Sequence, residues 1–266
     1  MGQNVKTLRT RIKSVDSTLH LTKAMGLVAS SKVRKALDNM QKSRQYSKAL
    51  KDTLTQLSAS QECKNSEYFN SNSSSKTKVI VIAGDRGMAG GYNANVFRQM
   101  QEFTDFDVIA IGKRACDRFA QAFVSSEKFS SEDAWKLSKE LCEDYKANKF
   151  NKLVVVSTKY ESAMSQVPQV IQLMPIEASN NANLTTIFEP NEKIILEKLI
   201  PEYISGSLIA LIRESFACEV TARRTAMDSA GKNATEMIDR LTLEYNRARQ
   251  GAITQEITEI VAGSGN

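Results

Sequence analysis

The chain has 266 residues, of which 41% are hydrophobic and 25% are charged, and its formal net charge is +6 at pH 7. This length allows one or two domains, and the composition is typical of a soluble protein. No stretch approaches 18 consecutive apolar residues, which excludes a transmembrane helix, and the basic start MGQNVKTLRTRIKSV lacks the apolar core of a secretory leader. We therefore expect a cytosolic protein.

Residues 1–60 predict one long amphipathic helix. Apolar side chains recur at steps of three and four residues, first at Val5, Leu8, Ile12, Val15 and Leu19, and again at Val33, Ala36, Met40, Leu50, Leu54 and Leu57. No proline interrupts this run. The next segment, 61–76, is rich in Ser and Asn and poor in apolar residues, which predicts a flexible linker.

Residues 77–190 predict an α/β domain. Short β-branched runs at 78–84, 107–112 and 152–160 alternate with helical stretches at 92–103, 113–123 and 132–148. Such alternation predicts a parallel sheet with helices on its faces. The run 166–176 contains prolines, so we expect it to form an edge strand.

Residues 200–266 predict a second long helix. Apolar or small residues again recur at steps of three and four, and the proline-free run 202–261 is roughly 90 Å long at 1.5 Å per residue. A helix of that length needs another long helix or a partner protein beside it. We therefore predict a mixed α+β and α/β fold, in which a long antiparallel coiled coil of the N- and C-terminal helices carries an inserted Rossmann-like α/β domain.

The sequence provides little material for a metal or thiol site. The cysteines are Cys63, Cys116, Cys142 and Cys218, and their spacing fits neither a zinc site nor a disulfide framework. His20 is the single histidine, which excludes a metal cluster built on histidine, and its place on a helix favours a packing or surface role. We expect no cofactor, no metal and no catalytic residue.

A glycine-rich loop leaves a nucleotide-binding enzyme open as an alternative. Gly84, Gly87, Gly90 and Gly91 lie between a strand and a helix, where phosphate loops occur, and Arg86 is suited to pairing with an anion. The spacing matches neither the dinucleotide fingerprint nor the P-loop, however. Glycines that serve a tight turn and close packing explain the same pattern.

The first helix is strongly basic, which leaves a nucleic-acid-binding scaffold as another alternative. Residues 1–51 contain 12 Lys or Arg but only two acids, Asp16 and Asp38. The basic stripe consists of Lys6, Arg9, Arg11, Lys13, Lys23, Lys32, Arg34 and Lys35. It could face nucleic acid, anionic lipid, an acidic protein or only solvent. Few aromatic residues accompany the stripe and no base-reading module is present, which counts against nucleic acid.

Four segments resemble one family in sequence. RIKSVDSTLHLTKAMGLVASSKVRKA at 11–36, GDRGMAGGYNANV at 84–96, SAMSQVPQVIQLMP at 162–175 and LTLEYNRARQGAITQEITEIVAGSGN at 241–266 look like the gamma subunit of the F-type ATP synthase. The resemblance implies a central rotor shaft that turns inside a hexamer of three alpha and three beta subunits and couples ion flow through the membrane ring to ATP synthesis or hydrolysis. It also implies the epsilon subunit and the membrane c ring as partners, and a peripheral place on the cytoplasmic side of the energy-transducing membrane.

The same resemblance implies particular contact residues. Arg223, Arg249, Gln250, Thr254 and Gln255 match positions that meet the catch loops of the beta subunit. Met25, with Lys23 nearby, matches the face near the acidic lever of that subunit, and Tyr203 matches a foot position close to the membrane ring.

This chain also departs from the family pattern. Met88 and Ala89 stand where many members have Leu or Met followed by Cys, and His20, Leu21 and Gly26 replace more usual polar, Ile and Lys residues. A cysteine pair of the chloroplast type is absent. Gly26 costs about 1 kcal/mol relative to alanine in a helix interior, so local softness or a close contact is expected near Met25.

Overall fold

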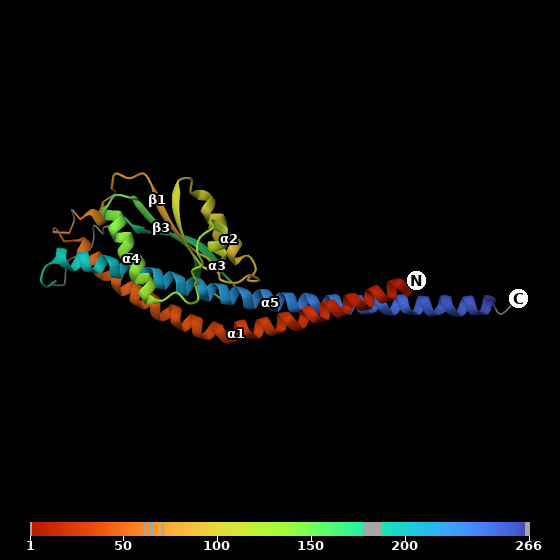
Figure 1. The fold of residues 1–266 in the computed structure, drawn as a ribbon. Coiled ribbons are helices and arrows are strands. Elements are labelled where there is room, and N and C mark those ends of the chain that lie inside the picture. Colours follow the sequence, from red (N-terminus) through yellow and green to blue (C-terminus); the bar gives the residue numbers. More distant parts are fainter. Residues whose placement is uncertain (1, 61, 64–65, 71, 178–187, 264–266) are drawn as a thin grey trace. The chain divides into compact units, whose positions relative to one another are not determined.

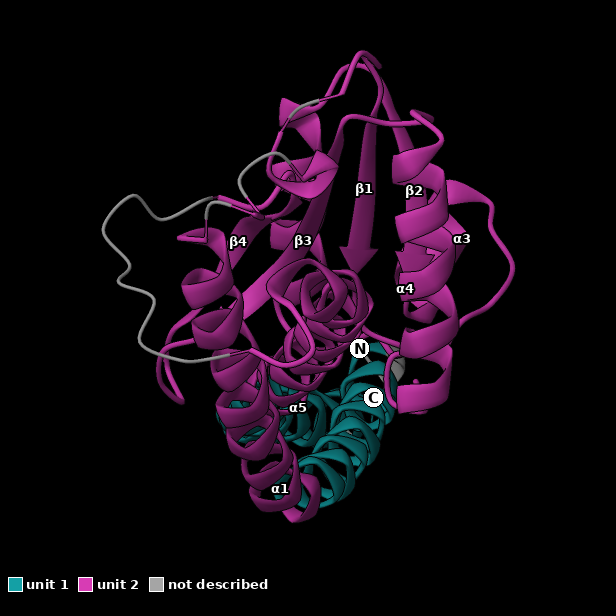
Figure 2. Cartoon of the chain, turned by 90° about the vertical axis from the view of Figure 1, so that its left-hand side faces the viewer, with its two compact units in different colours: residues 1–30, 223–266 teal, residues 31–222 magenta. Residues whose placement is uncertain are grey.

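The computed structural model describes residues 2–60, 62–63, 66–70, 72–177 and 188–263 (Figure 1). The chain divides into two compact units, one formed by residues 1–30 and 223–266 and the other by residues 31–222 (Figure 2). Two long helices, α1 (Gly2–Ser58) and α5 (Glu192–Gly263), contribute to both units. The boundary between the units therefore lies inside these helices, whereas the sequence predicted domain boundaries at the helix ends.

Unit 2, residues 31–222, is built around a four-stranded mixed sheet with the strand order β2-β1-β3-β4. Its strands are β1 (Thr77–Ile82), β2 (Phe106–Ile111), β3 (Lys152–Tyr160) and β4 (Gln166–Met174). The first three are parallel, as the alternating pattern predicted, and β4 lies at an edge, as its proline suggested. Because β4 pairs antiparallel to β3, the sheet is not wholly parallel.

Side chains alternate between the two faces of the sheet, and each face has its own core. Val79 and Val81 pack with residues of α2 (Tyr92–Gln99) and α3 (Lys113–Phe119). Ile80 and Ile82 point the other way, into a larger core with α4 (Ser131–Lys146) and the unit 2 segments of α1 and α5. This arrangement gives three layers, with helices on both faces of the sheet (Figure 1). The short 3-10 helix η2 (Met100–Glu102) follows α2.

The C-terminal helix starts earlier than the sequence analysis predicted. It begins at Glu192, not at residue 200, and Pro201 lies inside it. Asn191 caps the true start, since its side-chain oxygen accepts a hydrogen bond from the Ile194 N–H at 2.8 Å. A proline is common in the first turn of a helix, but Pro201 lies in the third turn of α5, where burial of the neighbouring Ile200 and Ile204 favours continuation of the helix.

The predicted linker at 61–76 is packed in its described part. Cys63 and Tyr68 are buried, and Tyr68 belongs to the 3-10 helix η1 (Glu67–Phe69) and stacks on Tyr145 with ring centroids 6.2 Å apart. The Asn72 side chain donates hydrogen bonds to the Phe150 and Tyr145 carbonyls at 2.7 and 3.3 Å. A few apolar and amide side chains thus fix a segment whose average composition is polar. Residues 61, 64, 65 and 71 of this range lie outside the described residues, as do residues 178–187 of the predicted α/β domain.

Unit 1, residues 1–30 and 223–266, contains the N-terminal part of α1 and the C-terminal part of α5. These two parts run antiparallel, since Gly26 faces Met227 and Thr22 faces Gly231 further along α5. Leu19, Ala29, Ala234 and Leu241 are among the side chains buried here. Within the described ranges, neither these helices nor the others are long and apolar enough to cross a membrane.

Candidate functional site

The contact residues implied by the resemblance fall into two groups within unit 1. Lys23, Met25 and Arg223 form the first group. This group lies near Gly26 of α1 and Gly231 of α5, where the two helices approach each other. Lys23 is exposed and lines an open groove together with Gly26, Leu27, Asp228, Gly231 and Lys232. Met25 is half-buried, and Arg223 is only 8% exposed. Arg223 therefore presents little surface to a partner, although its sequence position suggested a contact.

The second group lies near the end of α5. Arg249, Gln250, Thr254 and Gln255 are all exposed. The Thr254 hydroxyl donates to the Gln250 carbonyl at 2.9 Å, and the Gln255 amide donates to Glu259 Oε1 at 2.8 Å. Since α5 rises 1.5 Å per residue, this group is roughly 40 Å from Arg223 along the helix. The structure thus places the predicted residues in two separate patches.

Sequence reasoning missed an apolar feature next to the second patch. Ile253, Ile257, Ile260 and Val261 are 47–68% exposed. The first three are spaced four and three residues apart, so they share one face of α5. Large apolar side chains gathered on an exposed helix face indicate an interaction surface. The sequence shows the spacing of three and four residues. This spacing does not distinguish a side chain that packs within the chain from one that binds a partner protein.

Tyr203, the predicted foot position, lies in the large core of unit 2 and is 8% exposed. Burial raises the pKa of its hydroxyl, and a hydrogen bond with Ser207 partly offsets that effect. Its side chain supports the packing of α5.

The crevice where an α/β sheet usually binds a ligand is filled in this chain. Ligands bind beyond the carboxyl ends of parallel strands, where the strand order reverses, which here is between β1 and β3. Glu214, Ser215, Cys218 and Glu219 of α5 occupy that place, and all four are buried. A Cβ atom on Gly84 at the end of β1 would lie 2.7 Å from Glu219 Cδ. Side chains of α5 therefore occupy the place where a ligand would bind.

The glycine loop itself is held by a carboxylate of the chain. Asp85 accepts hydrogen bonds from the Lys113, Ser126 and Glu127 N–H groups at 3.0–3.1 Å and from the Ser125 hydroxyl at 2.6 Å. Burial alone would raise the pKa of Asp85, but these hydrogen bonds outweigh it and lower the pKa. Asp85 thus caps the N-terminus of α3 and fixes the loop after β1 to the 125–127 segment. Together with the filled crevice, this leaves the nucleotide alternative without structural support.

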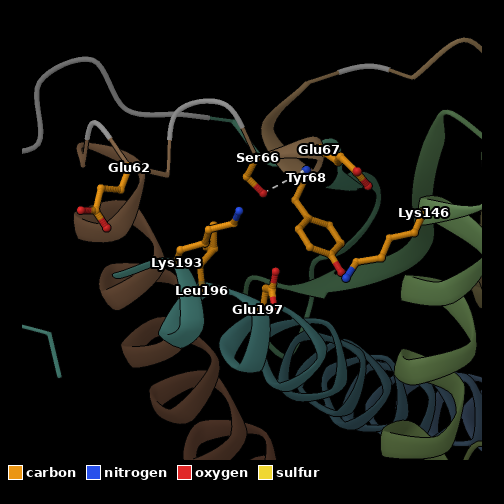
Figure 3. A pocket seen from close by; sticks show the side chains of 8 residues that line it. All are labelled: Glu62, Ser66, Glu67, Tyr68, Lys146, Lys193, Leu196 and Glu197. Atoms are coloured by element: carbon orange, nitrogen blue, oxygen red, sulfur yellow. Dashed lines mark hydrogen bonds between the residues drawn. The ribbon is translucent and has the colours of Figure 1, made fainter. Parts of the chain in front are cut away.

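A surface pocket in unit 2 also lacks the character of a ligand site (Figure 3). Its lining combines three carboxylates with two lysines: Glu62, Glu67, Glu197, Lys146 and Lys193, with Ser66, Tyr68 and Leu196. Lys146 Nζ lies 5.5 Å from the centroid of the Tyr68 ring. Opposite charges interspersed in this way favour no ligand of a single charge sign. Within the described residues, no group of three or more His, Cys, Asp or Glu side chains is arranged to hold a metal ion.

Comparison with known proteins identifies the family. The sequence model of the family described as ATP synthase matches residues 4–265. The chain is 38% identical over 282 residues to the ATP synthase gamma chain of Ruminococcus albus, covering 99% of this chain and 98% of the relative. The chain belongs to the ATP synthase gamma chain family. The gamma chain of Alkaliphilus metalliredigens is also 38% identical, over 99% of both chains, which confirms the resemblance stated from sequence segments.

Solved structures share the fold at low sequence identity. A chain of the Euglena gracilis mitochondrial ATP synthase, in the OSCP/F1/c-ring structure, matches with a TM-score of 0.70 and 15% identity, covering 99% of this chain and 94% of that chain. A chain of the central stalk and c-ring structure from Tetrahymena thermophila matches with a TM-score of 0.60 over 79% of this chain and 99% of that chain. The combination of long terminal helices and a central mixed sheet is therefore the fold of these chains.

Proposed function

We propose that this gamma chain is the central rotor shaft of an F-type ATP synthase and has no catalytic site of its own. In this proposal the unit 1 helices form an antiparallel coiled coil, the sheet of unit 2 is the Rossmann-like foot, and the shaft turns inside three alpha and three beta subunits. The epsilon subunit and the membrane c ring are its other partners, so the chain is a peripheral membrane protein on the cytoplasmic side. It would couple ion flow to ATP synthesis or hydrolysis.

The observation that carries the proposal is the exposed end of α5. Ile253, Ile257 and Ile260 leave apolar surface uncovered within a family whose members are named as subunits of a larger enzyme. The adjacent polar side chains of Arg249 and Gln250 suit a surface that must hold and then release a partner, because exposed polar contacts contribute at most about 1 kcal/mol each. Changing contacts then shift the nucleotide affinities of the surrounding sites as the shaft turns.

Assembly and activity together test the proposal. The chain is mixed with alpha and beta subunits from its source organism, and native mass spectrometry should show one copy with three of each. Steady ATP hydrolysis should require the chain, and the chain alone should hydrolyse no ATP. Separate components under conditions where alpha and beta assemble, or full hydrolysis by the isolated chain, would contradict the proposal.

The contact residues remain a proposal that variants can examine. Arg249→Ala with Gln250→Ala removes two exposed side chains, so hydrolysis by the complex should fall several-fold while amide exchange of the unit 1 helices stays unchanged. Arg247→Ala with Asn246→Ala is the matched control on neighbouring exposed positions. Arg223 is less suitable, because its burial would mix a folding effect with a contact effect. Equal losses in both pairs would refute the assignment.

A further inference from the structure

Strand β3 extends beyond its parallel neighbour and leaves backbone groups that need partners. Pairing between β1 and β3 ends at Val81 and Val156, whereas β3 continues to Tyr160. On its other side β3 pairs with β4 along this extension. Thr158 lies opposite Pro168, which has no N–H to donate to the Thr158 carbonyl. The inner edge of β3 at residues 158–160 therefore needs hydrogen-bonding partners other than β1.

Helix α5 supplies these partners from one face. Ser215 Oγ accepts from the Thr158 N–H at 3.2 Å, and Glu214 Oε1 accepts from the Tyr160 N–H at 2.8 Å. The Cys218 thiol donates to the Thr158 carbonyl at 3.6 Å. A helix thus takes the place of the missing strand at the end of the sheet.

Helix α1 closes the arrangement through Arg44. One guanidinium nitrogen, Nη2, donates to Glu214 Oε1 at 2.6 Å and to the Tyr160 carbonyl at 3.0 Å. Both backbone groups of Tyr160 are therefore bound by an ion pair whose two members come from different helices. The Glu214 side chain is 8% exposed, so loss of Arg44 would leave a buried, uncompensated charge.

We propose that Arg44, Tyr160 and Glu214 form a joint that fixes the sheet to both long helices, and that Arg44 and Glu214 are positioning residues for torque transmission. The inference rests on the proposed rotor function. The hydrophobic effect between layers is non-directional, whereas charge-assisted hydrogen bonds are directional and set an angle. The joint holds the sheet at a fixed angle about the axis of α5, so that rotation of one moves the other.

The test compares the joint with another contact between the same two helices. Glu214→Gln removes the charge that holds Arg44 with little change in shape, and Arg44→Met removes the partner. Glu202→Gln is the control, because Glu202 accepts from the exposed Tyr46 hydroxyl at 2.5 Å and is no part of the joint. A bead is attached through Glu102→Cys, which is exposed on unit 2 whereas the native cysteines are buried, and its angle is recorded in complexes with immobilised alpha and beta subunits.

Loss of the joint should widen the bead's angular distribution in paused complexes in both joint variants and leave it unchanged in the control. Amide exchange at Tyr160 should rise about tenfold in Arg44→Met, the effect of losing charge-assisted support. Faster exchange with unchanged variance, or equal widening in the control, would overturn the joint alone. Failure of the unsubstituted chain to assemble would instead overturn the proposed function, and the joint's role with it.

Discussion

Replacing Gly26 with alanine should stabilise unit 1. A Cβ atom at Gly26 would lie 3.5 Å from Met227 Cβ and 3.8 Å from Asp228 Oδ1, which are ordinary van der Waals distances. The methyl group therefore fits between the helices without displacing either one. Alanine is favoured over glycine in a helix interior by about 1 kcal/mol, so Gly26→Ala should raise the free energy of local opening by about that amount.

Amide exchange of residues 22–29 measures this change where it acts. Because the chain has two compact units, a single global melting curve does not isolate unit 1. A gain of 1 kcal/mol should slow exchange about fivefold. Gly231→Ala is the matched variant on α5, since its nearest neighbour would be Thr22 Oγ1 at 3.8 Å, and it should behave alike. Faster exchange in Gly26→Ala would refute the reasoning, because it would mean that the helices lie closer together than described.

Three further variants test unit 2. Gly112→Ala should destabilise the unit by more than about 3 kcal/mol in urea unfolding, because Gly112 has φ +94° and a Cβ atom would collide with the Ala83 carbonyl oxygen; an unchanged midpoint would contradict this geometry. Burial raises the pKa of the Cys142 thiol to about 12 from 9.0, so the stability that the neutral thiol contributes is complete below pH 9 and is lost as pH rises towards 12. Cys142→Ala should therefore reduce the loss of unfolding free energy in alkali by up to about 1.4 kcal/mol per pH unit. An unchanged dependence of stability on pH in this variant would exclude Cys142 as a source of the loss. Hydrogen bonds lower the pKa of Asp85 in the folded state, so the ionised carboxylate contributes stability that is present above about pH 4 and is lost as pH falls through this lowered pKa. Asp85→Asn should therefore cost about 1–3 kcal/mol of unfolding free energy at pH 7 and less in acid. A cost that does not depend on pH would count against ionised Asp85 as the source.

Local sequence patterns predict the helices and strands of this chain. They do not predict the contacts between residues that are distant in sequence. The three-and-four spacing predicted both long helices, and the β-branched runs predicted the strands, because each pattern reflects burial of one face or of a whole strand. The sequence pattern predicts that the last helix begins at residue 200, whereas α5 begins at Glu192, because the surrounding core favours helix on both sides of Pro201. The 61–76 segment packs through the buried side chains of Cys63 and Tyr68. The average composition of the segment, which is polar, does not reveal these two residues.

The candidate site shows the same division. Family resemblance indicates candidate contact residues, but only the structure separates the buried Arg223 from the exposed Arg249. The joint joins residues 116 and 170 positions apart in the chain, Arg44 with Tyr160 and Arg44 with Glu214, and no local spacing records such a pairing. Likewise, the glycine loop has the local pattern of a phosphate site, whereas side chains of α5, distant in sequence, occupy its surroundings.

Direct observation of rotation is the decisive measurement. Alpha and beta subunits are immobilised, the bead is attached through Glu102→Cys, and ATP is added. The rotor proposal predicts that the bead turns in one direction with three equivalent pauses per turn, one for each beta subunit, and that it stops when ATP is exhausted. ATP hydrolysis at the full rate by assembled complexes whose beads do not rotate would contradict the proposal.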